Sequence, residues 1–159
     1  MCHVSCIIFG AKNLSKEEIS GKTVLEIGSY DVNGTLRPII ESWKPKEYIG
    51  TDIMAGPGVD IVCPAENILK YFGDKKFDVV ISTEMLEHAE YWEKTISNIK
   101  NICVPGGLML LTTRSKGFGY HAYPHDYWRY EKEDMENIFS DCEILEIEKD
   151  NQAAGIFIK

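Results

Sequence analysis

Short apolar runs alternate with helix-like segments along most of the chain, and this alternation restricts the fold more than any other feature of the sequence. The clearest run covers residues 77–82 (FDVVIS) and is apolar almost throughout. Such runs are typical of parallel strands that are covered on both faces. Similar runs cover residues 23–27, 48–52, 59–63 and 108–112. The pattern predicts a parallel sheet with helices on both sides.

The segments between these runs have helical spacing and recognisable ends. The expected helices cover residues 36–43, 65–72, 92–103 and 132–139. Thr35 is a predicted N-cap for the first, and Pro45 follows its end. Gly73 closes the second helix, and the Pro-Gly-Gly segment 105–107 is expected to end the third.

Two further predicted strands, residues 143–148 and 155–158, are joined by a turn too short to hold a helix. Parallel neighbours need a crossover of roughly a dozen residues or more, so these two strands must be antiparallel if they pair. The sequence therefore predicts a three-layer α/β fold, with a mostly parallel sheet of seven strands that ends in an antiparallel hairpin.

The length of 159 residues fits a single domain, residues 1–159. Residues 1–21 are expected to cover the sheet edge, without a helical lid before the first strand, and residues 115–131 to form a loop above the strand ends. No apolar run approaches the roughly 20 residues of a membrane span. The N-terminus lacks the pattern of a signal peptide, and five scattered cysteines do not suggest a disulfide framework. A cytoplasmic location without membrane contact is expected.

The formal net charge of −8 bears on the choice of partner. Nucleic-acid binding needs a basic face, and the lysines and arginines form no long cluster. A nucleic-acid substrate is therefore disfavoured, and a small molecule is expected instead. A homo-oligomer is left open.

Polar residues and glycine follow the predicted strands at the edge where open parallel sheets bind ligands. Gly28 ends the first strand, where a missing side chain lets the backbone approach a ligand. Asp52 ends the second strand, and its carboxylate can accept hydrogen bonds from both hydroxyls of a ribose. A tight turn, an exposed loop and simple core packing are the structural alternatives for Gly28, Asp52 and the adjacent Ile53.

The order of five motifs resembles that of the class I S-adenosylmethionine-dependent methyltransferases, and in particular a methyltransferase type 11-like subgroup. The motifs are residues 24–28 (VLEIG), 48–52 (YIGTD), 65–67 (AEN), 77–88 (FDVVISTEMLEH) and 105–113 (PGGLMLLTT). The resemblance implies a Rossmann-like methyltransferase fold, S-adenosylmethionine as the cofactor and S-adenosylhomocysteine as its product.

The resemblance also implies a set of cofactor contacts. They are, in chain order, Glu26, Gly28, Ser29, Asp52, Ile53, Ala65, Glu66, Ser82, Thr83 and Glu84. The first three correspond to contacts with the methionine moiety, and the next two to contacts with ribose and adenine. Ala65 and Glu66 correspond to the adenine amine, and the last three to the methionine and the transferable methyl. The sequence departs from the family at Tyr30 and Val32, where glycine is common.

Residues 117–130 (GFGYHAYPHDYWRY) are far richer in aromatic and basic side chains than an ordinary solvent loop. Such residues suit an apolar pocket with polar handles, although the rings could instead pack against one another. The candidates for substrate binding are Tyr123, Tyr127, Trp128 and Arg129. The candidates for a catalytic base are His88, His121 and His125, since histidine titrates near neutral pH.

Cys2, His3 and Cys6 could supply soft metal ligands, but zinc usually needs four convergent ligands, and no second cysteine pair exists. No metal site is therefore expected, although a weak one at these three residues is left open. The sequence predicts methyl transfer to oxygen or nitrogen of a small molecule or sugar. The alternatives are a catalytically silent S-adenosylmethionine-binding module and a dinucleotide-dependent oxidoreductase, which the missing G-x-G-x-x-G motif disfavours.

Overall fold

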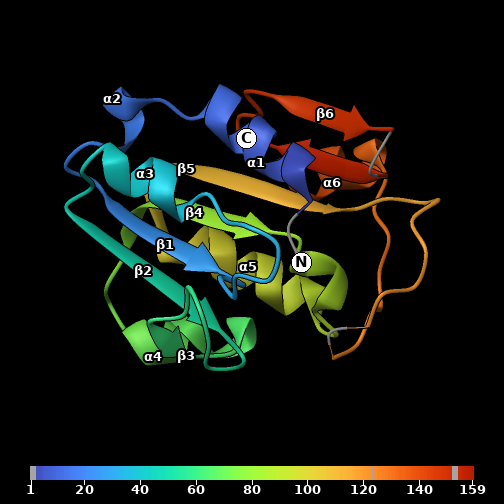
Figure 1. Ribbon diagram of the computed structural model, residues 1–159, viewed down its shortest axis with the longest axis horizontal. Coiled ribbons are helices and arrows are strands. Elements are labelled where there is room, and N and C mark those ends of the chain that lie inside the picture. Colours follow the sequence, from blue (N-terminus) through green and yellow to red (C-terminus); the bar gives the residue numbers. More distant parts are fainter. Residues whose placement is uncertain (1–2, 123, 152–153) are drawn as a thin grey trace.

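The computed structural model describes residues 3–122, 124–151 and 154–159, and it has one seven-stranded sheet at its centre (Figure 1). The order of strands across the sheet is β3-β2-β1-β4-β5-β7-β6. The strands are β1 (Thr23–Ile27), β2 (Glu47–Asp52), β3 (Ile61–Val62), β4 (Phe77–Thr83), β5 (Cys103–Arg114), β6 (Ile147–Asp150) and β7 (Gly155–Ile158). The first five are parallel, and β7 pairs antiparallel with both β5 and β6. The predicted topology is confirmed.

Helices cover both faces of this sheet and enclose two separate hydrophobic cores. One core lies under α1 (Val4–Asn13), α2 (Lys16–Ile19) and α3 (Arg37–Ser42). The other lies under the two 3₁₀ helices η1 (Ala65–Asn67) and η2 (Leu86–His88), together with α4 (Ile68–Phe72), α5 (Trp92–Ile102) and α6 (Lys132–Ile138). Along β1, Val24 faces the first core while Leu25 and Ile27 face the second, as the strand period of two requires. No helix within the described residues is long and apolar enough to span a bilayer.

Two helices that the sequence pattern did not reveal, α1 and α2, precede the first strand. The His3 side chain caps α1, and α1 buries Cys6 and Phe9 against the sheet. The ring of Phe9 packs against Phe157 of β7, with the two centroids 5.3 Å apart. Val4 and Ile8 on the other side of α1 are each 60% exposed, so the helix is apolar on more than one face and lacks a clear sequence period.

The structure also corrects several predicted boundaries. Helix α5 ends at Ile102, and the 105–107 segment lies within β5. A Cβ atom at Gly107 would lie 2.8 Å from the carbonyl oxygen of Asp78, so glycine there permits a close approach to β4. The third strand has only two residues, β6 begins at Ile147, and the expected helix over residues 65–72 starts as the 3₁₀ turn η1. Thr35 precedes the N-cap of α3, which is Leu36.

Candidate functional site

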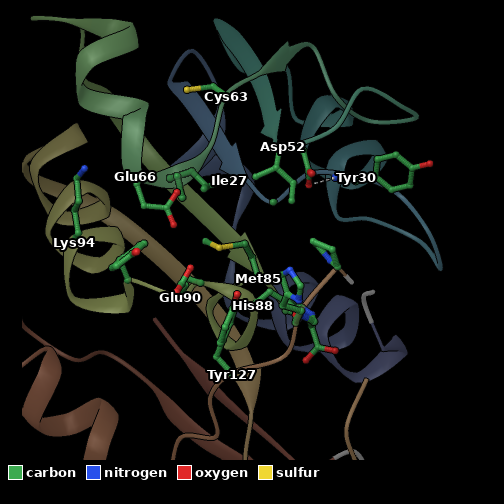
Figure 2. Close-up of a pocket in the computed structure, with 18 of the residues that line it drawn as sticks. Ile27, Tyr30, Asp52, Cys63, Glu66, Met85, His88, Glu90, Lys94 and Tyr127 are labelled. Carbon is green, nitrogen blue, oxygen red and sulfur yellow. Dashed lines mark hydrogen bonds between the residues drawn. The ribbon is translucent and has the colours of Figure 1, made fainter. Parts of the chain in front are cut away.

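A cavity of about 550 Å³ opens where the parallel strands end, at the edge that the sequence indicated. It is bounded by residues after β1, β2, β3 and β4, by the start of α5 and by the loop of residues 115–131. Figure 2 shows Asp52 and Tyr127 on opposite sides of it, with Met85 and His88 between them. The volume lies in the range of sites that bind small molecules, roughly 300–1,000 Å³.

Gly28 lets the chain turn sharply into this cavity. Its φ angle is +82°, and a Cβ atom there would lie 2.5 Å from the Cβ of Met85. Its backbone N–H donates to the carbonyl of Thr51 at 2.8 Å, and the N–H of Ser29 donates to the same oxygen at 3.0 Å. Gly28 lines the cavity, whereas the Ser29 side chain is buried beside it. The turn therefore has no room for a side chain.

Asp52 lies in the cavity wall with its carboxylate fixed by two backbone groups. Its Oδ2 accepts from the N–H of Tyr30 at 3.2 Å (Figure 2). Its Oδ1 accepts from the N–H of Met54 at 3.2 Å. Each oxygen retains a further lone pair for a ligand hydroxyl. Ile53 lines the cavity next to Asp52, and Ala65 and Glu66 of η1 line it from the neighbouring strand end. This arrangement fits a nucleoside.

Glu26 is placed differently from the other candidates. It is not among the described residues that line the cavity, and only 1% of it is exposed. Its Oε2 accepts from the hydroxyl of Tyr48 at 2.5 Å. Burial raises the pKa of Glu26 to about 7, although the hydrogen bond from Tyr48 and the charge of Arg37 oppose the rise.

We expect Glu26→Gln to stabilise the protein at high pH. An unfolded Glu26 titrates near 4.5 and a folded one near 7, so between these values the folded state holds more protons and its stability falls as pH rises. Glutamine removes this loss and keeps an acceptor for Tyr48. The stability difference between variant and wild type should be about 2 kcal/mol larger at about pH 8 than at about pH 5.

Urea denaturation without cofactor measures this difference, and the exposed Glu17→Gln is the control. An equal effect of Glu26→Gln at both pH values would contradict the argument.

The candidate residues at the end of β4 differ in whether they reach the cavity. Ser82 and Thr83 are buried in the sheet, whereas Glu84 reaches the cavity with a φ angle of +55°. Glu84 forms a buried ion pair with Arg114 at the end of β5. Burial raises the pKa of Glu84 to about 9, and the nearby Cys6 of α1 adds to the rise. Neither Arg114 nor Cys6 was expected near the site, because each comes from a distant part of the chain.

The loop of residues 115–131 brings some of the acceptor candidates to the cavity and not others. His88, His125 and Tyr127 line it. His121 lies behind His88, with the ring centroids 4.8 Å apart, and is not among the described lining residues. Trp128 donates its ring N–H to the carbonyl of Ala89 at 2.9 Å. Tyr123 lies outside the described residues. Several further lining residues were not predicted, among them Met85, Ala89, Glu90, Tyr91, Lys94 and Pro124.

Arg129 holds the loop together instead of facing the cavity. Its guanidinium donates to both carboxylate oxygens of Asp126, at 2.5 and 2.6 Å. It also donates to the carbonyls of Phe118 at 3.2 Å, Gly119 at 2.8 Å and Trp128 at 2.7 Å. This hydrogen-bonded pair with Arg129 holds the pKa of Asp126 well below its usual range. Arg129 therefore links the two halves of the loop through these hydrogen bonds.

Residues 9–155 match the sequence model of a family described as a methyltransferase domain, which is most of the 159-residue chain. No curated protein sequence matches the chain.

Solved structures of methyltransferases share the fold. One from Mesorhizobium loti is 13% identical, with a TM-score of 0.73 over 96% of both chains. One from Aquifex aeolicus is 13% identical, with a TM-score of 0.65 over 99% of this chain and 97% of that one. Magnesium protoporphyrin IX methyltransferase from Synechocystis PCC 6803, solved with bound S-adenosylmethionine, is 14% identical, with a TM-score of 0.66 over 98% of this chain and 75% of that one.

The family match agrees with the site geometry. The turn at Gly28, the available lone pairs of Asp52 and the cavity between them suit a nucleoside that carries an amino-acid tail. The match also excludes the dinucleotide-dependent oxidoreductase that the sequence left open. The chain belongs to the methyltransferase domain family, and it is an enzyme that uses S-adenosylmethionine.

Proposed function

We propose that the enzyme methylates an oxygen or nitrogen atom of a small molecule or sugar. The observation that carries the proposal is one cavity with two chemically different ends. Gly28 and Asp52 line the end that suits the cofactor. His125 and Tyr127 line the other end, where polar and aromatic side chains suit an acceptor with several hydroxyl or amino groups.

The enzyme's own residues bind and orient the reactants. S-adenosylmethionine, when bound, supplies an electrophilic methyl group on its sulfonium. Asp52 accepts hydrogen bonds from the ribose hydroxyls, and the turn at Gly28 accommodates the methionine end. Because methyl transfer is an in-line displacement, holding the acceptor atom in line with the methyl provides much of the rate enhancement.

His125 is the base that this geometry supports best. His88 has its Nδ1 2.5 Å from the carbonyl oxygen of His125, and its Nε2 is buried. Both ring nitrogens of His121 are buried as well. The exposed side chain of His125 lines the cavity, so its ring can take a proton from an acceptor hydroxyl or amine.

A transfer assay tests this function. Labelled S-adenosylmethionine is incubated with separate pools of sugars, amino compounds, phenols and short oligonucleotides. We expect label in at least one of the small-molecule pools and none in the oligonucleotides, because the protein carries a net charge of −8. His125→Ala should reduce the rate about 100-fold or more. Label confined to the oligonucleotides would refute the proposal, and failure to label any pool would favour the silent binding module.

We expect Asp52→Ala to weaken binding of S-adenosylhomocysteine by about 1–3 kcal/mol, or about 5- to 150-fold. The substitution removes the acceptor for the ribose and leaves the N–H groups of Tyr30 and Met54 without it. Calorimetric titration measures the affinity, and the exposed Asp74→Ala, which changes the charge equally, is the control. Equal affinities of the folded Asp52→Ala protein and the wild type would refute the ribose assignment.

A further inference from the structure

Three potential metal ligands meet behind the acceptor end of the cavity. Glu87 and His88 belong to η2, and His121 comes from the loop of residues 115–131. One ligand atom from each lies within 4.8 Å of the other two. The side chain of Glu87 is fully buried, and those of His88 and His121 are 11% and 13% exposed. Two segments far apart in sequence thus bring a carboxylate and two imidazoles together with little exposure to solvent.

The atoms that face one another have unsatisfied bonding capacity. Within the described part of the chain, Glu87 Oε1, His88 Nε2 and His121 Nε2 are buried and have no hydrogen-bond partner. Glu87 Oε1 lies 3.9 Å from His88 Nε2 and 3.7 Å from His121 Nε2. Both distances are too long for direct hydrogen bonds. A buried polar atom without a hydrogen-bond partner costs folding free energy. A group bound between these three atoms would remove that cost.

Contacts on the far side of each ring determine which nitrogen is available. His88 Nδ1 lies 2.5 Å from the carbonyl oxygen of His125, which can only accept, so Nδ1 carries the hydrogen. His121 Nδ1 lies 3.3 Å from Asp126 Oδ2 without forming a hydrogen bond in this geometry, and the negative charge of that carboxylate favours a hydrogen on Nδ1. Each neutral ring then has a lone pair on Nε2. Metal-binding histidines are typically oriented by such contacts to a carbonyl or a carboxylate.

The carboxylate is oriented in the same way. Glu87 Oε2 accepts from the hydroxyl of Thr113 at 2.9 Å, which leaves Oε1 directed at the two imidazoles. Three electron pairs therefore face one another. Ligand atoms about 2.1 Å from a tetrahedral ion are about 3.4 Å apart, so a small inward shift of the rings would close the site around an ion.

We propose that Glu87, His88 and His121 bind a divalent transition metal ion of the zinc class, which joins the loop of residues 115–131 to η2. Two imidazoles and one carboxylate suit Zn²⁺, and a water molecule completes four ligands. The site departs from the sequence-based expectation of no metal, and it shares no residue with the weak candidate at Cys2, His3 and Cys6. The proposal does not depend on the identity of the methyl acceptor.

Titration of metal-free wild-type protein with Zn²⁺, and separately with Co²⁺, tests the proposal. We expect one tightly bound equivalent of Zn²⁺ and the visible absorption of four-coordinate Co²⁺. Histidine ring nitrogen signals in NMR should show Nε2 of His88 and of His121 shifting on addition of Zn²⁺. A ring proton as the occupant would give neither stoichiometric binding nor Co²⁺ bands.

Matched variants locate the ion. Glu87→Gln and His121→Gln keep the side chains close in size and should each weaken Zn²⁺ binding about 100-fold or more. His125→Ala keeps the carbonyl that contacts His88 and should retain wild-type metal affinity. The double substitution Cys2→Ser with His3→Ala should retain it too.

Absence of stoichiometric Zn²⁺ binding by the wild type would overturn the proposal. Loss of binding only in the Cys2→Ser, His3→Ala protein would overturn it as well. If either glutamine variant fails to fold, the wild-type NMR shifts decide the question, because unmoved signals of His88 and His121 would rule out this site.

Discussion

Gly28→Val is expected to abolish detectable binding of S-adenosylhomocysteine and to lower the free energy of unfolding by about 3 kcal/mol. The φ angle of +82° at this position is costly for any residue with a Cβ atom, and more so for a branched one. The new Cβ would also lie 2.5 Å from Cβ and 2.6 Å from Cγ of Met85. Relief of that contact would move either the turn or Met85, and both line the cavity.

Gly73→Val separates conformational strain from obstruction of the site. Gly73 also has a positive φ, of +58°, but a Cβ there meets nothing within 4 Å. It lies at the end of α4 and does not line the cavity, so its replacement should cost stability while leaving ligand affinity unchanged. Urea denaturation and calorimetry measure the two quantities. Wild-type affinity in a folded Gly28→Val protein would show that the first turn does not pass the cofactor.

Arg129→Ala should loosen the loop of residues 115–131 without affecting the affinity for the cofactor. The substitution removes the donors to Asp126 and to the carbonyls of Phe118, Gly119 and Trp128. We expect amide hydrogen exchange in residues 117–130 to rise about 10- to 100-fold, because the loop would open more often. Affinity for S-adenosylhomocysteine should stay within about 2-fold, and methyl transfer should fall about 100-fold as the acceptor loses its alignment.

Lys116→Ala is the control for this prediction, since Lys116 is exposed in the same loop. Arg129→Lys should recover little, because an ammonium group cannot reproduce the planar fork that binds Asp126 and the carbonyls together. If amide hydrogen exchange in residues 117–130 is unchanged in Arg129→Ala, the contacts between the loop and η2 are sufficient to keep the loop ordered.

The parallel sheet and its antiparallel hairpin were predictable because their signals are local. The apolar run in β4 and the short turn before β7 are consistent with only a few topologies. Helix α1 was missed because its exposed Val4 and Ile8 hide the helical period. The 105–107 segment carries turn residues, but it forms part of a strand because β4 and β5 pair across it with a shifted register.

The candidate residues at the strand ends were easier to place at the cavity than those of the loop of residues 115–131. Asp52 and Gly28 are positioned by the ends of their own strands, so strand prediction also placed them. The contact of His121 with Glu87, by contrast, depends on the path of a long loop. The linking role of Arg129 likewise depends on carbonyl groups, which no residue pattern reveals.

The attachments of the loop of residues 115–131 to η2 have a consequence for divergence within the family. The N–H groups of Tyr127 and Trp128 both donate to the carbonyl of Glu87, at 2.9 and 3.1 Å. The Nδ1 atom of His88 likewise contacts the main-chain carbonyl oxygen of His125. Because these links use main-chain atoms of the loop, substitutions at positions 124 and 127 can change what the pocket accepts without loosening the loop. Duplicated copies of such a gene could therefore acquire new acceptors by single substitutions while keeping the same scaffold.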